Sequence, residues 1–218
     1  MAEIRPFAPP DLGDLYRIAL ATGASGEDAS HLYADPDLVG HIYAAPYALL
    51  SPELAFVAHD GEGVAGYIVG AMDTRAFEET LEARWWPTLR PRYADPSSVA
   101  PADWSADQLR SWQIHHPGRT PRRVAEPYPS HLHINLLPRL QGRGVGQRLM
   151  TNWLDAVRAM GSRGAHLGVS ATNLRAIRFY EAYGWRKPAL ERPPPQGVVW
   201  YALSLHDAAR PSGIRLGD

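Results

Sequence analysis

Periodic hydrophobic positions in the first third of the chain predict a strand, a helix and a β-hairpin. Apolar residues at helical spacing follow Pro9-Pro10-Asp11, and two apolar runs flank the turn Asp60-Gly61-Glu62-Gly63. Between them, Leu38, Ile42 and Tyr43 favour a helix in a stretch that is otherwise irregular. The predicted elements are a strand at 3–7, a helix that starts near residue 11, a helical segment within 27–50, and strands at 54–59 and 64–72.

The last third alternates between strand and helix patterns. Val145, Leu149, Trp153 and Val157 recur every four residues, which predicts an amphipathic helix with one buried face. Strands are predicted at 131–137, 166–170 and 198–205, helices at 144–160 and 174–183, and a frayed tail after Asp207. This order predicts an α/β fold, in which helices pack on the faces of a mixed central sheet.

Residues 74–129 differ in character from both flanks. Helical patterning at the start gives way to a segment rich in proline and aromatic residues, and four of the seven tryptophans lie here: Trp85, Trp86, Trp104 and Trp112. Large aromatic rings favour burial. We therefore expect an ordered insertion or lid before the next strand, and not a flexible linker.

The composition is that of an ordinary globular protein, and it excludes some chemistry. Positive and negative side chains nearly balance, with a net charge of −1, which favours neither nucleic acid nor an anionic membrane as a partner. Because the chain has no cysteine, disulfides, cysteine-ligated zinc and an acyl-cysteine intermediate are excluded. We expect no secretory signal and no membrane span, and a single cytoplasmic domain over 1–218.

Three glycines at alternate positions, Gly142, Gly144 and Gly146, lie between a predicted strand and a predicted helix. The free N–H groups and partial positive charge of a helix start attract anions, and glycines let the backbone come close to a phosphate. This layout is typical of a phosphate site. Gln147 stands where a dinucleotide motif needs its third glycine, and no Lys-Ser/Thr pair follows as in a P-loop. The simpler alternative is a tight turn.

The loop Gln141-Gly142-Arg143-Gly144-Val145-Gly146 resembles motif A of the GNAT acetyltransferases, Gln-x-x-Gly-x-Gly. The segment from Asn173 to Trp185 resembles the other GNAT signature, Asn-x-x-Ala-x-x-Phe-Tyr-x-x-x-Gly followed by an aromatic residue. The runs 131–138 and 161–165 are similar to bacterial acetyltransferases related to the C-terminal domain of O-GlcNAcase. The resemblance implies a GNAT fold, whose mixed sheet has splayed parallel strands and helices on both faces.

In that family, the loop amides hold the pyrophosphate of acetyl-CoA, and the preceding strand pairs with its pantetheine arm. A backbone N–H near Leu136 or Leu137 would then face the thioester carbonyl as an oxyanion donor. Two consecutive leucines also predict a β-bulge there. The cofactor-binding residues that the resemblance implies are Leu136, Leu137, Gln141, Gly142, Arg143, Gly144, Val145, Gly146, Gln147, Asn173, Arg178 and Tyr180.

Four residues are candidates for catalysis. Tyr180 matches the position that the family uses as general acid toward the coenzyme sulfur, although its helical spacing also fits a packed aromatic. His131, His133 and Asn135 alternate with apolar residues, so this strand has one polar face, which predicts a wet cleft. His133 is the candidate base, since imidazole titrates near neutrality. Asn135 could hold an acceptor or order a water, and Asp73 is a further possibility.

The histidines also permit a metal site, with His115-His116 nearby in sequence, but no third ligand with zinc-like spacing accompanies them. We therefore predict no metal. The segment 75–128 carries eight arginines and seven acidic residues, so the sequence predicts no charge preference for the acceptor, which could be a small molecule or a protein. The protein could be a monomer or a homodimer.

The sequence thus predicts an acyl-CoA N-acetyltransferase that moves an acetyl group from acetyl-CoA to an amine by direct transfer in a ternary complex. The main alternative is a catalytically silent acyl-CoA-binding module. A third possibility is a carbohydrate- or protein-recognition domain that uses the aromatic segment 74–129.

Overall fold

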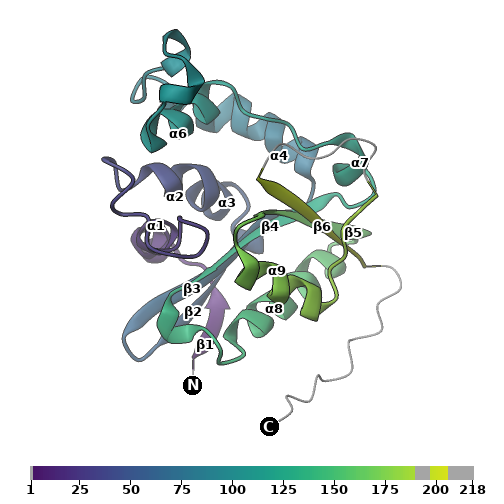
Figure 1. Cartoon of the computed structure of the whole chain (residues 1–218). Coiled ribbons are helices and arrows are strands. Elements are labelled where there is room, and N and C mark those ends of the chain that lie inside the picture. The colour runs from purple at the N-terminus through teal and green to yellow at the C-terminus, as the bar shows by residue number, and fades with distance from the viewer. Residues whose placement is uncertain (1, 190–196, 206–218) are drawn as a thin grey trace.

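A six-stranded sheet in the order β1-β2-β3-β4-β5-β6 organises the computed structural model, which describes residues 2–189 and 197–205 (Figure 1). The predicted strands are confirmed, with ends that differ by a few residues. Most neighbours are antiparallel, and β4 and β5 are parallel. The strands are β1 (Glu3–Pro6), β2 (Phe56–Asp60), β3 (Gly63–Ala71), β4 (Ser130–Leu136), β5 (Gly164–Ser170) and β6 (Val198–Ser204).

The parallel strands β4 and β5 pair at Ser130 with Ala165 and at His131 with His166, and they diverge beyond these pairs. β4 continues beside β3 as far as Leu136, while β5 pairs along its whole length with β6. The expected splayed parallel strands are therefore present. The opening between them lies at the end of β4 that leads into the glycine loop.

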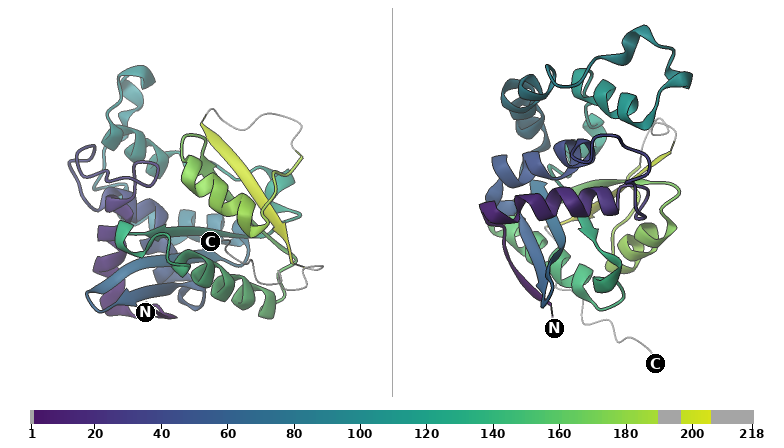
Figure 2. Two further views of the ribbon diagram at one scale, coloured as in Figure 1. Left: turned by 60° about the horizontal axis from the view of Figure 1, so that its bottom comes forward. Right: turned by 90° about the vertical axis from the view of Figure 1, so that its left-hand side faces the viewer.

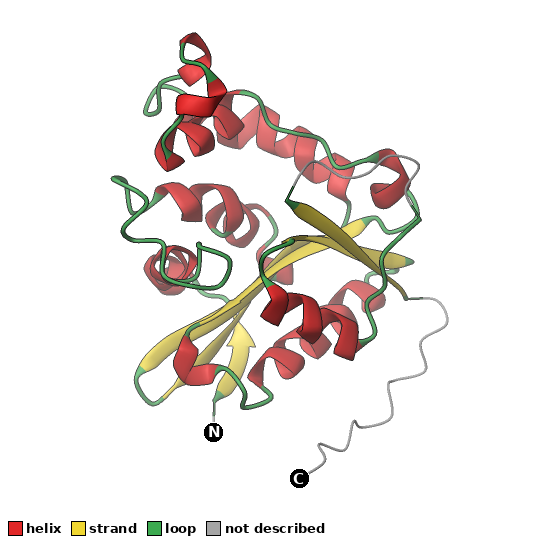
Figure 3. Cartoon of the chain, viewed as in Figure 1, coloured by secondary structure: helices red, strands yellow, loops and turns green. Residues whose placement is uncertain are grey.

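Helices cover both faces of the sheet (Figure 3). α8 packs on one face, where the fully buried Trp153 ring lies against Gly70 of β3. α1 and α3 contact β3 from the other face, and α1 crosses the first strands in the right-hand view of Figure 2. The helices are α1 (Leu12–Ala21), α2 (Leu38–Tyr43), α3 (Ala45–Leu50), α4 (Thr74–Thr80), α5 (Trp86–Leu89), α6 (Ala106–His115), α7 (Arg122–Ala125), α8 (Val145–Ala159) and α9 (Leu174–Tyr183).

The segment 74–129 forms helices α4 to α7 and connects β3 to β4. A π-helical turn at Leu81–Trp85 joins α4 to α5, and Ser105 begins α6 with a capping box. α6 packs against α2 and α5, above the helices of the N-terminal part (Figure 1). The segment is therefore ordered, as its aromatic content predicts.

The prediction of a β-bulge at Leu136 and Leu137 is wrong. The register between β3 and β4 is continuous to Leu136, and the N–H of Leu137 donates to the carbonyl of Ala65 at 2.8 Å. Leu137 turns into the core because the chain enters a 3₁₀ turn at Pro138–Leu140. The register shift of this sheet lies between Ala58 and His59 in β2 instead.

The predicted tail after Asp207 lies outside the described residues. Across the two described ranges, no helix is both long and apolar enough to cross a bilayer.

Candidate functional site

The glycine loop places unpaired backbone amides at the start of α8. Gly142 and Gly144 have φ values of +70° and +72°, a left-handed conformation that side chains disfavour. Gly144 is the N-cap and offers no side chain to the first turn, whose first bonded amide is that of Arg148, 3.1 Å from the Gly144 carbonyl. The three amides from Val145 to Gln147 therefore remain without a partner inside the helix. The start of α8 therefore combines a partial positive charge with free backbone N–H donors.

A cavity of about 360 Å³ lies over this loop, between the end of β4 and α9. Most of the predicted cofactor-binding residues line it, and four do not. Those that line it are Leu136, Gln141, Gly142, Gly144, Gly146, Gln147, Asn173 and Tyr180. Leu137 and Val145 are buried in the core, whereas Arg143 and Arg178 are exposed outside the cavity.

The position of Leu136 in the sheet favours it over Leu137 as an amide donor. Because the N–H of Leu137 is bound to β3, the strand alternation turns the N–H of Leu136 the other way, into the opening beside β5. The carbonyl of Leu136 points the same way and accepts from Nε2 of Gln141 at 2.8 Å. Of the two predicted oxyanion donors, Leu136 is therefore the one whose amide is not used in the sheet.

Arg175 occupies the place at the loop that was expected for Arg178. The Arg175 guanidinium lines the cavity, donates to Oε1 of Gln141, and donates to the carbonyl of Gly26 at 3.0 Å. Arg178 lies on the opposite side of α9 from Tyr180, because two residues are 200° of helical rotation. Arg175 lies in the first turn of α9, next to Asn173 of the same cavity, and this position is the sequence signal that favours it over Arg178.

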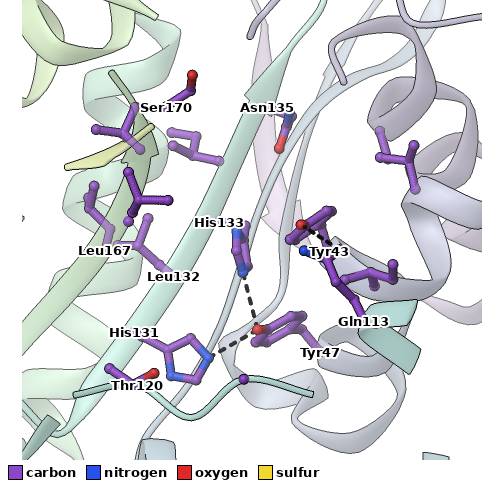
Figure 4. Close-up of a pocket in the computed structure, with 18 of the residues that line it drawn as sticks. Tyr43, Tyr47, Gln113, Thr120, His131, Leu132, His133, Asn135, Leu167 and Ser170 are labelled. Atoms are coloured by element: carbon purple, nitrogen blue, oxygen red, sulfur yellow. Dashed lines mark hydrogen bonds between the residues drawn. The ribbon is translucent and has the colours of Figure 1, made fainter. Parts of the chain in front are cut away.

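A second cavity of about 1000 Å³ lies on the α1–α3 side of β4. The side chains of His131, His133 and Asn135 point into it (Figure 4), so the predicted polar face does line a cleft. The two cavities share Asn135 and Tyr180, among other residues. Asn135 is held there by a hydrogen bond of 2.6 Å from its Nδ2 to Oγ1 of Thr22. A cofactor at the loop and an acceptor in the larger cavity would meet at this junction.

A chain of hydrogen bonds fixes the proton positions on two histidines, and Figure 4 shows the two bonds of this chain at Tyr47. The Thr74 hydroxyl donates to the carbonyl of Pro129 at 2.7 Å, so Nδ1 of His131, 2.8 Å away, donates to Thr74. Nε2 of neutral His131 then accepts from the Tyr47 hydroxyl at 3.0 Å. Nε2 of His133 must in turn donate to the Tyr47 oxygen at 3.1 Å. Nδ1 of His133 is therefore left unprotonated, as a proton acceptor.

Burial keeps this histidine cluster neutral. Burial lowers the pKa of His133 to about 4 and that of His166 to about 4, and it lowers the pKa of His131 well below the usual value. Repulsion among the imidazoles acts in the same direction on His131 and His133. The rings of His131 and His166 stack with centroids 5.6 Å apart. His166 was not identified from the sequence, because its strand has no polar alternation.

Tyr180 is both a packed aromatic and a residue of the junction. It is 7% exposed, and its ring lies 5.4 Å from Phe179, 6.3 Å from Trp185 and 6.2 Å from Tyr201. Burial raises the pKa of the Tyr180 phenol. The phenol therefore keeps its proton at neutral pH and can act as a donor.

The remaining candidates lie elsewhere. Asp73 is exposed and caps α4, with its Oδ1 accepting from the Ala76 amide at 3.0 Å, and it does not line either cavity. His115 contacts the carbonyl of Tyr93, and the exposed His116 pairs with Asp95. Among the residues that the structure describes, no group of three or more histidine, aspartate or glutamate side chains could hold a metal ion.

Comparisons with known proteins agree with this geometry. The family model described as the acetyltransferase (GNAT) family matches residues 103–185. Protein O-GlcNAcase of Rattus norvegicus is 26% identical over 203 residues, which are 93% of this chain and 22% of that protein. The chain thus spans about a fifth of the length of the curated relatives it matches.

Solved structures share the whole fold. The crystal structure of SsHAT is 35% identical in sequence, with a TM-score of 0.84, and the match covers 93% of this chain and 98% of that one. The structure of yncA from Salmonella typhimurium with its cofactor acetyl-CoA is 16% identical, with a TM-score of 0.51 and coverage of 98% and 99%.

Proposed function

This chain belongs to the GNAT acetyltransferase family, and from that premise we propose that it moves an acetyl group from acetyl-CoA to an amine by direct transfer in a ternary complex. The observation that carries the proposal is the junction at Asn135 and Tyr180, where the loop cavity and the larger cavity meet. A bound thioester and a bound amine would approach each other there without a covalent acyl-enzyme.

The glycine loop fits the pyrophosphate of acetyl-CoA. The unpaired amides from Val145 to Gln147 can donate to phosphate oxygens, and the positive end of the α8 dipole favours the anion. Arg175 at the rim of the cavity adds an exposed positive charge. The Leu136 amide is the candidate donor to the thioester oxygen. When bound, acetyl-CoA supplies the activated acetyl group.

The proton route uses His133, which lines the larger cavity, and Tyr180, which lies at the junction. A bond forms between the amine nitrogen and the acetyl carbon as the carbon–sulfur bond breaks. His133 Nδ1 takes the proton from the nitrogen and then releases it to solvent, and Tyr180 gives its proton to the departing sulfur and regains one from solvent. With a pKa of about 4, His133 is too weak to deprotonate an ammonium ion, so the amine must enter neutral. His133 accepts the proton only after the attacking nitrogen has become cationic.

The first experiment tests the cofactor site by calorimetric titration of acetyl-CoA. Gly144→Glu should abolish binding, because a carboxylate would stand where the diphosphate must lie. Gly144→Ala is the matched control, since it carries the same left-handed backbone strain without the charge. Binding that survives in the glutamate variant would contradict the site.

The second experiment tests transfer itself. Purified protein is incubated with acetyl-CoA and a broad panel of amines while free thiol is measured, and acetylated product is identified by mass spectrometry. Acetyl-CoA binding without turnover on any amine would favour the silent acyl-CoA-binding module. The cytoplasmic location and the monomeric or homodimeric state stay predictions, which cell fractionation and analytical ultracentrifugation would test.

A further inference from the structure

Arg110 projects from α6 into the larger cavity with only neutral partners. Its Nε donates to the Tyr33 hydroxyl at 3.1 Å, and its Nη1 donates to the Tyr43 hydroxyl and to Oε1 of Gln113, both at 3.0 Å. The guanidinium carbon stands 5.3 Å from the centre of the Tyr43 ring. Nη2 makes no hydrogen bond within the described part of the chain, and its two N–H groups remain available to a ligand.

The one acidic residue of α6, Asp107, is engaged elsewhere. Asp107, one helical turn before it, accepts from the amides of Ala34 and Asp35. In residues 2–189 and 197–205, no carboxylate forms an ion pair with Arg110. A guanidinium does not lose its proton in a protein, so the charge of Arg110 has to be balanced by something other than deprotonation.

The two glutamates that line the same cavity cannot supply that balance. Glu78 is bound to Arg75 at 2.6 Å, and its other oxygen accepts from the Thr120 amide at 2.8 Å. Glu82 forms a two-pronged pair with Arg90 at 2.7 and 2.8 Å. With both glutamates neutralised by arginines of their own, the cavity carries an excess of positive charge at Arg110.

We propose that the acceptor is a primary amine that also bears a carboxylate, and that Arg110 binds this carboxylate. The proposal rests on the acetyl-transfer function proposed above. A planar guanidinium with free N–H groups matches a carboxylate in shape and charge, and the partly buried setting strengthens the pair. The nearly balanced charge count of 75–128 conceals this preference, since it does not show that both glutamates lining the cavity are paired with arginines of the same segment.

The spacing of the site limits the size of the acceptor. The Tyr43 ring contacts both Arg110 and the candidate base, with the His133 ring centroid 5.5 Å and the Arg110 guanidinium carbon 5.3 Å from its centre. The guanidinium carbon is therefore at most about 11 Å from the centre of the His133 ring. An amine and a carboxylate separated by a short methylene chain fit this span. A second arginine, Arg119, also lines the cavity, but its side chain is exposed.

The test compares ω-amino acids with n-alkylamines of the same chain length, from 3-aminopropanoate to 8-aminooctanoate. In the wild type, kcat/KM for the best ω-amino acid should exceed that of its matched alkylamine by about ten- to hundredfold, the contribution of a hydrogen bond to a charged group. Arg110→Gln should reduce this ratio to near one, and Arg110→Lys should restore part of it. Arg119→Gln is the control and should leave most of the ratio intact.

A binding measurement separates this proposal from the proposed enzyme activity. Acetyl-CoA affinity is first measured by calorimetry for each variant. Pentanoate, which has a carboxylate and no amine, should then raise the melting temperature of the wild type in complex with coenzyme A, and should not do so in Arg110→Gln. A rise in melting temperature with pentanoate, without turnover on any amine, would support the carboxylate site and contradict the proposed acetyl transfer. Equal turnover of ω-amino acids and alkylamines in the wild type, with acetyl-CoA bound normally, would overturn the carboxylate site alone.

Discussion

The hydroxyl of Tyr47 lies 3.1 Å from Nε2 of His133 and thereby connects α3 to the polar face of β4. Because the Tyr47 proton is directed to His131, this hydroxyl can only accept from His133. The contact therefore determines which nitrogen of His133 carries hydrogen, and it leaves Nδ1 toward the cavity. Tyr47 is a positioning residue, which acts on the acceptor through His133.

Replacing Tyr47 with Phe removes that constraint. His133 would lose the acceptor for its Nε2 hydrogen, and the ring could move its proton to Nδ1. We expect kcat to fall about ten- to hundredfold, within the usual range for a general base, with acetyl-CoA affinity unchanged. Tyr16→Phe is the matched control, since the Tyr16 hydroxyl binds Nδ1 of His41 at 2.7 Å outside both cavities. An equal loss of kcat in both variants would argue against the tautomer role.

The pH dependence of folding should report the neutral histidines. The pKa values of His131, His133 and His166 are lowered in the folded state, so below pH 6.5 the unfolded chain binds protons that the folded chain does not. Their contribution to the free energy of unfolding is fully present above pH 6.5 and is lost as the pH falls toward 4. Each of the three histidines should lower the free energy of unfolding by up to about 1.4 kcal/mol per pH unit below 6.5.

Urea unfolding between pH 7 and pH 5 measures this effect, because aspartates and glutamates are ionised in both states over most of that range. His133→Gln should reduce the slope of unfolding free energy against pH relative to the wild type. A wild-type free energy that stays flat between pH 7 and pH 5 would show that the imidazoles are protonated in the folded protein.

Tyr180→Phe tests the proton donor to the sulfur. The substitution keeps the packed ring and removes only the hydroxyl, so we expect unchanged acetyl-CoA affinity and a kcat lower by about tenfold or more. Tyr201→Phe is the control. Its ring is 6.2 Å from Tyr180, and its hydroxyl binds Oε1 of Glu181 at 2.6 Å, away from both cavities. Stopped-flow detection of coenzyme A release compares the two variants, and an unaltered rate in Tyr180→Phe would exclude the role.

The parts of the site that are local in sequence could be predicted from the sequence. The glycine loop is such a part, since strand, loop and helix follow one another directly, and so is the polar face of β4, because alternation alone defines it. Their predicted positions agree with the structure. Arg175 could also have been predicted, because it lies in the first turn of α9 next to Asn173, but Arg178 was predicted instead.

The contacts between distant segments could not be predicted in this way. Tyr47 reaches His133 across 86 residues, and Thr74 reaches His131 across 57. No periodicity links such residues, and a tyrosine in a helix pattern is indistinguishable from any other buried ring. The isolated charge of Arg110 likewise depends on which arginines pair with Glu78 and Glu82, which composition does not reveal.

Gly70 is a position where the fold should not tolerate a side chain. A Cβ at this position would overlap the carbonyl oxygen of His131 on β4 and the ring of Trp153 on α8. The carbonyl belongs to the sheet and cannot move without shifting His131 and its hydrogen bonds. We therefore expect Gly70→Ala to lower the free energy of unfolding by about 2–3 kcal/mol. It should also lower kcat, because the histidine chain is displaced.

Gly13→Ala is the control for the same added methyl group, since nothing lies within 4 Å of a Cβ there and the residue belongs to α1. That variant should be unchanged or more stable by up to about 1 kcal/mol, because alanine favours a helix over glycine. In a double variant, Trp153→Phe should relieve only part of the Gly70→Ala cost, because the smaller ring frees space on the α8 side and leaves the clash with the carbonyl. Full recovery of stability in denaturant unfolding would mean that the tryptophan alone requires glycine at this position.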